Sequence, residues 1–280
     1  MMPRMGGNDV EHSHGMHVVH DGARQAPPLL LVHGSGASGG SWAPMVPALA
    51  GHRHVIRIDL PGCGHSPPAP PYDVPVQAAR VAALLDDLGL RHIAAAGHSS
   101  GGYVLTALAE QRPDLVGSLT LISTGPALDA FLPQPAVLRA LLEPPLGPLL
   151  WPLRTDSMIR KAIRATAARP VDVPDELVAG VRSISYRTFR AMDRRTTAYV
   201  AERSVPERLA ALRLPLLVIF GAADPRWEPS SAHRYERVPD ARVELLPGVG
   251  HLPLLEAPEA TGELLLGFTA ADAGAPPVLP

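Results

Sequence analysis

Cysteine, lysine and aromatic residues are scarce in this chain of 280 residues. Cys63 is its only cysteine, so no disulfide can form within the chain, and secretion gains no support. Lys161 is the only lysine, and the formal net charge is −2. Because no basic stripe with interleaved aromatic residues is present, we expect no binding to nucleic acid or to an anionic membrane surface.

Long apolar runs are also missing. No stretch reaches the length of a membrane span, and the polar start, residues 1–14, lacks the apolar core of a signal peptide. We therefore expect a cytoplasmic protein with a flexible tail over residues 1–14. Four histidines near this start, His12, His14, His17 and His20, suggest a metal site. They have no cysteine or carboxylate partner at ligand spacing, so we predict no metal.

Hydrophobic residues make up 46% of the chain, enough for a sizeable core in one large domain or in a core with an insertion. Short apolar runs bounded by glycine or proline are typical of a buried parallel sheet. They occupy residues 29–32, 54–60, 93–96, 119–122, 216–220 and 242–246. Helical patterns lie between several of them, at residues 76–88, 102–112 and 259–268. The alternation predicts a mostly parallel, doubly wound α/β fold.

Residues 125–204 interrupt this rhythm with proline-punctuated helical patterns and no convincing strand. The expected helices cover residues 136–142, 158–168, 176–185 and 189–202. We expect a helical cap inserted over the sheet edge, between two parts of a core at residues 15–124 and 205–280. Core helices joined by long loops are the alternative, which the usual lengths of loops disfavour. Ser204 and Glu207 form a predicted capping box where the chain returns to the core.

The pentapeptide Gly97-His98-Ser99-Ser100-Gly101 follows an apolar run and precedes a helical pattern. A strand, then Gly-x-Ser-x-Gly, then a helix is the context of a nucleophile elbow. The tight turn strains the serine backbone, and Gly97 and Gly101 are expected because a Cβ would not fit there. The helix would direct its N-terminal amides at the same place. The segment predicts nucleophilic chemistry at Ser99.

A serine nucleophile needs a base, and the base needs a carboxylate that orients it. Asp224 follows the run at 216–220, and His251 follows the run at 242–246. Both belong to the carboxyl ends of predicted strands, which share one edge of a parallel sheet. We predict Asp224 and His251 as the partners of Ser99. Asp129 is the alternative acid and His233 the alternative base, although His233 sits in a helical pattern.

Four segments together resemble the α/β-hydrolase superfamily, in its branch with a serine nucleophile and a helical cap. They are LVHGSG at 31–36, DLPGCGHS at 59–66, the pentapeptide at 97–101, and GHLP with EAP at 250–258. The resemblance covers roughly residues 15–124 and 205–268. It implies an oxyanion hole made by the backbone amides of Ser35 and Ser100. A serine rather than an aspartate at position 99 argues against the epoxide hydrolase and haloalkane dehalogenase branches.

Three further residues could line a pocket: His33, Trp42 and Trp227. In this family a histidine at position 33 more often shapes its loop, and the two tryptophans are also explained as buried or cap-contacting aromatics. Arginines of the expected cap could attract carboxylated or phosphopantetheine-linked substrates, or could simply form a solvated helix face. They are Arg154, Arg160, Arg164, Arg194 and Arg195.

The predicted function is a serine hydrolase that cleaves a small-molecule carboxylic ester or lactone through an acyl-enzyme. It requires no metal and no organic cofactor. An acyltransferase or a thioesterase would use the same acyl-enzyme, so both remain alternatives. A carbon–carbon bond hydrolase and a non-catalytic ligand-binding protein of the same fold are less favoured. The substrate and the oligomeric state stay open.

Overall fold

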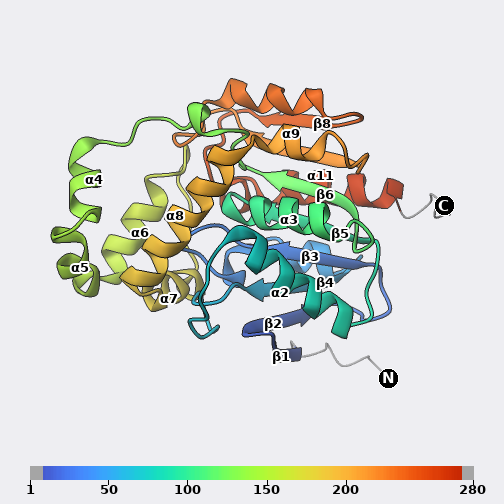
Figure 1. The fold of residues 1–280 in the computed structure, drawn as a ribbon, viewed down its shortest axis with the longest axis horizontal. Helices are drawn as coiled ribbons and strands as arrows, with labels where there is room; N and C mark the ends of the chain where they lie inside the picture. The colour runs from blue at the N-terminus through green and yellow to red at the C-terminus, as the bar shows by residue number, and fades with distance from the viewer. Residues whose placement is uncertain (1–8, 273–280) are drawn as a thin grey trace.

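The computed structural model describes residues 9–272 and contains an eight-stranded sheet with the order β1-β2-β4-β3-β5-β6-β7-β8 (Figure 1). Strands β3 to β8 are parallel, and β1 and β2 add an antiparallel hairpin at the edge beside β4. This arrangement confirms the expected mostly parallel α/β fold. The strands are β1 (Asp9–Ser13), β2 (Met16–Asp21), β3 (Pro28–Val32), β4 (His54–Asp59), β5 (Ile93–His98), β6 (Val116–Ile122), β7 (Leu216–Gly221) and β8 (Arg242–Leu246).

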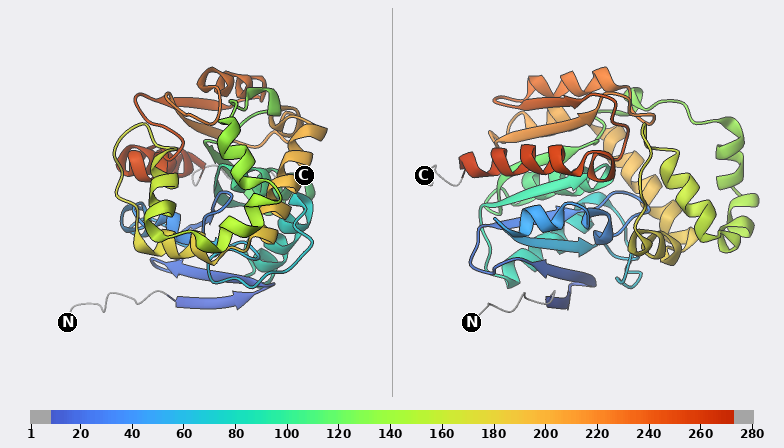
Figure 2. Two further views of the ribbon diagram at one scale, coloured as in Figure 1. Left: turned by 90° about the vertical axis from the view of Figure 1, so that its left-hand side faces the viewer. Right: turned by 180° about the vertical axis from the view of Figure 1, so that it is seen from behind.

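Helices cover both faces of the sheet. Successive side chains of a strand point to opposite faces, and in β3 Leu30 and Val32 join one core cluster whereas Leu29 and Leu31 join the other. The first face carries α2 (Val74–Asp87), α3 (Ser100–Gln111) and α9 (Val205–Leu209). The second carries α1 (Val46–Ala50) and α11 (Pro258–Asp272), which lie in front in the right-hand view of Figure 2. Burial on both faces explains why β3 and β7 are apolar at nearly every position.

Residues 125–204, which lie between β6 and α9 and are called here the β6–β7 segment, are mainly helical. They contain η2 (Leu128–Ala130), α4 (Ala136–Leu142), α5 (Leu146–Leu150), η3 (Trp151–Leu153), α6 (Asp156–Arg164), α7 (Asp175–Ser183) and α8 (Tyr186–Glu202). Helices occur at all four expected places, and α5 was not expected. Helices α4 to α7 project beyond one end of the sheet in Figures 1 and 2.

This segment rests on loops that follow strands. The Cβ that an alanine at Gly180 of α7 would add lies 2.4 Å from Ser38 Oγ, in the loop after β3. Ser183 at the end of α7 donates a hydrogen bond of 3.1 Å to the Gly64 carbonyl, after β4. The helices therefore lie over the carboxyl edge of the sheet, where the candidate residues were expected.

The N-terminal hairpin corrects the expected tail. Asp9–Ser13 form β1, so a tail through His14 is wrong for residues 9–14, and residues 1–8 lie outside the described part of the chain. In β2, partly exposed His17 and Val19 alternate with buried positions. The histidines of this strand make the segment look polar, which is why no strand was predicted there. The strand forms because pairing with β4 satisfies the backbone hydrogen bonds of β2.

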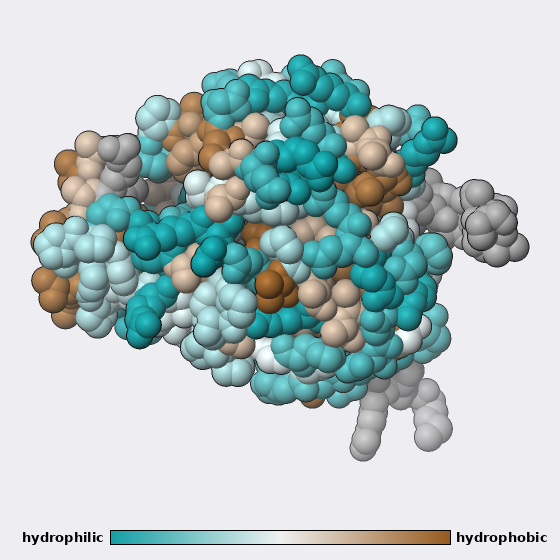
Figure 3. Space-filling model, viewed as in Figure 1, coloured by the Kyte–Doolittle hydropathy of each residue, from teal (hydrophilic) through white to brown (hydrophobic). Residues whose placement is uncertain are grey.

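Short helices complete the part of the chain that the structure describes: η1 (Gly39–Trp42), η4 (Pro229–Arg237) and α10 (Pro253–Glu256). Within residues 9–272, no helix is both long enough and apolar enough to cross a membrane. Large exposed apolar side chains gather on the outer part of the β6–β7 segment, seen as brown surface at the left of Figure 3. They include Val137, Leu141, Leu146, Leu149, Leu153 and Met158.

Candidate active site

Ser99 sits in a strained turn between β5 and α3. Its φ of 50° and ψ of −118° lie in a region that side-chain-bearing residues rarely adopt. An added Cβ at Gly97 would lie 2.6 Å from the Gly102 nitrogen, and one at Gly101 would lie 2.4 Å from the Val32 carbonyl oxygen. Only glycine fits at both positions, as the sequence predicted from the sharpness of the turn.

Ser99, His251 and Asp224 form a chain of hydrogen bonds across three loops. His251 Nε2 lies 3.1 Å from Ser99 Oγ, and His251 Nδ1 lies 2.8 Å from Asp224 Oδ2. The other carboxylate oxygen, Asp224 Oδ1, accepts from the backbone N–H groups of Arg226 at 2.8 Å and Trp227 at 3.2 Å. The turn after β7 thus fixes the carboxylate, and the carboxylate orients the imidazole.

His251 is held in its neutral form, which can accept a proton. Burial lowers its pKa below the ordinary value of 6.5, an effect that the neighbouring Asp224 partly opposes. The neutral ring donates Nδ1–H to Asp224, which leaves the Nε2 lone pair facing the Ser99 hydroxyl. The arrangement can remove a proton from Ser99 near neutral pH.

The backbone of His251 is held from two sides. Its N–H donates to the Thr166 carbonyl at 2.9 Å, in the β6–β7 segment, and its carbonyl accepts from His98 Nε2 at 2.9 Å. Burial lowers the pKa of His98 to about 3, so this ring is neutral and serves as a donor. In the sequence His98 stands out only as a position within the pentapeptide, and no local pattern reveals its contact with His251, 153 residues further along the chain.

Glu256 is a second residue that sequence reasoning missed, beyond its place in the resemblance. Its buried carboxylate accepts from the backbone N–H groups of Gly250 at 2.8 Å and Leu252 at 3.0 Å, which flank His251. The same carboxylate accepts from the Ala168 N–H at 2.7 Å. One side chain therefore ties the loop that carries His251 to the β6–β7 segment.

The loop after β3 lies against the N-terminus of α3. Ser35 Oγ donates to Ser100 Oγ at 2.8 Å, and an added Cβ at Gly34 would lie 3.1 Å from the Ser99 Cβ. Ser100 is the first residue of α3, and the first N–H groups of a helix lack partners within the helix. The structure brings the two residues predicted for an oxyanion hole together beside Ser99.

His33 is fully buried and shapes this loop. It donates from Nδ1 to the Gly34 carbonyl at 2.8 Å, and its Nε2 accepts from the Leu60 N–H at 3.0 Å. Burial lowers its pKa, which keeps the ring neutral. With both nitrogens bonded to backbone, His33 is a loop-shaping residue, the alternative weighed above.

The two tryptophans are a buried aromatic residue and one that contacts the β6–β7 segment, which was the alternative to a role in lining a pocket. Trp42 is fully buried in the core cluster on the α1 and α11 face. Trp227 packs against Phe131 of the β6–β7 segment, with ring centroids 5.0 Å apart, and pairs with it in an isolated β-bridge.

The residues considered as the alternative acid and base lie at the surface in other ion pairs. Asp129 pairs with Arg234 at 2.7 Å, and His233 pairs with Glu236 at 2.7 Å.

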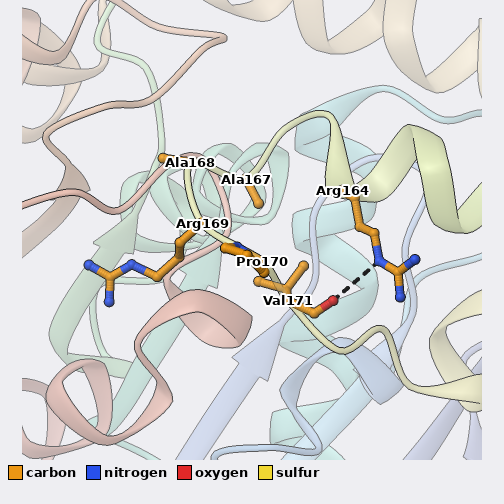
Figure 4. Close-up of a pocket in the computed structure, with 6 residues that line it drawn as sticks. All are labelled: Arg164, Ala167, Ala168, Arg169, Pro170 and Val171. Atoms are coloured by element: carbon orange, nitrogen blue, oxygen red, sulfur yellow. Dashed lines mark hydrogen bonds between the residues drawn. The ribbon is translucent and has the colours of Figure 1, made fainter.

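A surface pocket of about 500 Å³ lies on the β6–β7 segment, lined by Arg164, Ala167, Ala168, Arg169, Pro170 and Val171 (Figure 4). Ser99, Asp224 and His251 are not among its lining residues. In Figure 4 the side chains of Arg164 and Arg169 point in opposite directions, and Arg164 Nε donates to the Val171 carbonyl at 3.2 Å. The pocket is a surface feature rather than a chamber over Ser99.

Most arginines predicted to attract anions already have partners. Arg154 donates to the Trp151 carbonyl at 2.8 Å, Arg160 pairs with Asp175, and Arg195 pairs with Asp73 at 3.1 Å. Arg154 and Arg160 thus bind groups within the segment, and Arg195 binds it to the residue that precedes α2, which favours a structural role for these arginines over anion binding.

Comparison with known proteins decides the family. A model described as the alpha/beta hydrolase family matches residues 29–264, which include Ser99, Asp224 and His251. The chain belongs to the α/β hydrolase family. A relative from Azorhizobium caulinodans, named "Putative carbamate hydrolase RutD", is 31% identical over 278 residues, or 95% of this chain and 98% of the relative.

Other α/β hydrolases agree with this assignment. A pimeloyl-acyl-carrier-protein methyl ester esterase of Neisseria meningitidis is 28% identical over 254 residues, covering 86% of this chain and 76% of that protein. The crystal structure of an N-acyl homoserine lactonase superposes with a TM-score of 0.80 at 21% identity, covering 96% and 98% of the two chains, and shows the fold alone. The protein is an esterase-like α/β hydrolase.

Proposed function

We propose that this α/β hydrolase cleaves carboxylic esters or lactones through an acyl-enzyme on Ser99. The observation that carries the proposal is the hydrogen-bonded chain from Ser99 Oγ to His251 and on to Asp224 Oδ2. Such a chain activates a hydroxyl that is otherwise a poor nucleophile. Relatives named as ester hydrolases support the same bond type.

In the first half-reaction, His251 Nε2 takes the Ser99 proton while Oγ attacks the carbonyl carbon of the ester. Asp224 holds the ring and stabilises its positive charge. The tetrahedral intermediate collapses, the carbon–oxygen bond to the leaving group breaks, and His251 returns the proton to the departing alcohol.

In the second half-reaction, His251 removes a proton from water, and the resulting hydroxide attacks the acyl carbon. The bond to Ser99 Oγ then breaks, the serine recovers the proton from His251, and the carboxylic acid leaves. These steps balance with ester and water as the only reactants, so they require no metal or organic cofactor.

In this proposal, the backbone N–H groups of Ser35 and Ser100 donate hydrogen bonds to the negatively charged oxygen of each tetrahedral intermediate. One donor of this kind contributes about 3 kcal/mol to transition-state stabilisation. The Ser35–Ser100 hydroxyl contact supports the assignment because it holds the two backbone segments together.

The β6–β7 segment, over residues 125–204, would act as a cap that walls off the substrate site. Its placement over the carboxyl edge of the sheet and its contact with the His251 backbone through Thr166 support this role. A cap built largely from apolar residues suits a small-to-medium hydrophobic acyl group or lactone.

The test is intact-mass analysis after treatment with a fluorophosphonate, together with hydrolysis of a panel of p-nitrophenyl esters. Wild type should gain a single adduct, and Ser99→Ala should gain none and lose kcat by about 10⁴-fold or more. Ser230→Ala, at an exposed serine of η4, is the matched control and should behave as wild type. No adduct on folded wild type would contradict the proposal.

The same panel separates hydrolysis from acyl transfer. With a competing alcohol present, a hydrolase gives mainly the free acid. If the new ester forms faster than the free acid, the protein is an acyltransferase rather than a hydrolase. The role of Ser99 as the nucleophile would be the same in both cases.

A further inference from the structure

Three residues on neighbouring strands lie directly opposite one another at the edge of the sheet that the β1–β2 hairpin forms. His12 of β1 pairs with His17 of β2, and His17 pairs in turn with Asp59 of β4. Residues directly opposite each other in neighbouring strands project to the same face. His65, in the loop after β4, joins the row, with its ring centroid 4.7 Å from that of His17. Nitrogen and carboxylate donors separated in sequence thus meet on one surface.

The distances around Asp59 suit a metal ion. His17 Nδ1 lies 3.2 Å from Asp59 Oδ2, and His65 Nδ1 lies 3.6 Å from the same oxygen. One ligand atom from each of the three residues lies within 4.8 Å of the others. Bonds of about 2.0–2.1 Å at tetrahedral angles place ligand atoms about 3.3 Å apart. The three donors therefore need little movement to share one ion.

We propose that His17, Asp59 and His65 bind a divalent metal ion of the zinc type, with His12 adjacent as a candidate fourth ligand. His12 lies beside His17, with ring centroids 5.3 Å apart. Two or three imidazoles with one carboxylate are donors that zinc accepts in tetrahedral sites. The ion would replace the proton between His17 and Asp59, and each imidazole would keep its remaining proton on Nε2.

The site is accessible on one side and rigid on the other. The His65 side chain is 68% exposed, whereas those of His17 and Asp59 are 14% and 4% exposed. The Asp59 carboxylate is fixed by the N–H of Gly39 at 2.6 Å and by that of His65 at 2.9 Å. These bonds orient the carboxylate, as outer contacts do in established metal sites.

Neutral imidazoles are the form that binds a metal. His17 and His12 are direct partners in the β1–β2 hairpin, and His17 is also the direct partner of Asp59 in β4. The other two histidines considered in the sequence are occupied elsewhere. His14 pairs with Asp87, and His20 contacts His54 and Glu11. Of the four histidines near the start of the chain, only His17 and His12 therefore lie in the row that includes Asp59 of β4, the carboxylate that the sequence did not reveal.

Binding would link the β1–β2 hairpin to the end of β4 and stabilise the folded state. An ion that binds only the folded chain raises the melting temperature as its concentration exceeds the dissociation constant. The inference stands apart from the proposed ester hydrolysis, because its readouts need no substrate.

The experiment uses the full chain without an affinity tag, freed of metal with a chelator. Zn²⁺ is titrated by calorimetry, and Co²⁺ is added separately so that its visible absorption reports the coordination geometry. We expect one Zn²⁺ per chain, a higher melting temperature, and a Co²⁺ spectrum typical of tetrahedral N/O ligation. Absence of saturable binding would overturn the proposal.

Variants assign the ligands. His65→Gln and His17→Asn should each weaken Zn²⁺ binding at least about 10-fold, since each removes a ligand. His65→Gln is the safer test, because the side chain is largely exposed. His14→Gln, on the same hairpin, is the matched control and should bind as wild type. Binding that survives both ligand substitutions, or that is lost only in His14→Gln, would contradict the assignment.

Discussion

Single residues at the candidate active site depend on backbone hydrogen bonds for their position. The loop of His251 is held by the His98 ring, by the Thr166 carbonyl and by the Glu256 carboxylate. A carboxylate that accepts several N–H groups can satisfy them all at once, whereas an amide has only one accepting oxygen. Glu256 is accordingly a positioning residue for His251.

We predict that Glu256→Gln lowers kcat about 10- to 100-fold with little change in KM, because an unsatisfied buried donor costs about 1–3 kcal/mol. Steady-state hydrolysis of a p-nitrophenyl ester measures both constants. Glu259→Gln, on the exposed face of α11, is the control and should leave them unchanged. An unchanged kcat in a folded Glu256→Gln protein would show that the carboxylate does not position His251.

At the scale of elements, α3 joins the candidate site to the β6–β7 segment. Its first turn carries Ser100, and near its last turn Glu110 accepts from Tyr199 of α8 at 2.8 Å and from Arg208 of α9 at 3.2 Å. Arg208 is itself buried, and its guanidinium also lies 3.3 Å from Glu202. Glu110 therefore fixes both the end of the segment and the return of the chain to the core.

Replacing Glu110 by glutamine should destabilise the fold by about 2 kcal/mol, because it leaves the buried charge of Arg208 poorly compensated. Urea denaturation followed by circular dichroism measures the change. Glu202→Gln removes the exposed partner of the same guanidinium and should cost less than about 1 kcal/mol. Equal losses in the two variants would contradict the anchoring role.

The whole molecule contains several buried histidines that are kept neutral. Burial lowers the pKa of His98 to about 3 and that of His54 to about 4, and it also lowers the pKa values of His33 and His251. Below pH 6.5 the unfolded chain takes up protons at these positions more readily than the folded chain does, because each pKa is lower in the folded chain. Stability is therefore full above pH 6.5 and falls as the pH decreases toward the folded pKa values.

We expect the urea midpoint to decrease steadily between pH 7 and pH 5. A single neutral buried histidine such as His98 contributes up to about 1.4 kcal/mol per pH unit in this window. The slope should be shallower in His98→Asn than in wild type. A midpoint that stays constant over this range would show that these rings gain no proton on unfolding.

Local patterns in the sequence were sufficient for the parallel strands and for the turn at Ser99. Apolar runs flanked by glycine or proline fix where a buried strand can form, and a Gly-x-Ser-x-Gly segment between a strand and a helix fixes the backbone of the turn. The expectation that Asp224 and His251 lie close to Ser99 followed from the rule that parallel strands end at one sheet edge. The structure brings these three side chains within hydrogen-bonding distance.

Contacts between distant segments were decided only by the tertiary structure. The β1–β2 hairpin exists because β4 offers an unpaired edge, which no pattern within residues 9–21 reveals. His17, Asp59 and His65 meet through strand register and the path of a loop, and Glu256 joins its loop to Ala168 across 88 residues. The sequence by itself determines local backbone preferences and burial patterns, because these depend on neighbouring residues. The pairing of side chains from different loops depends on the packed fold, which places their atoms within a few ångströms of each other.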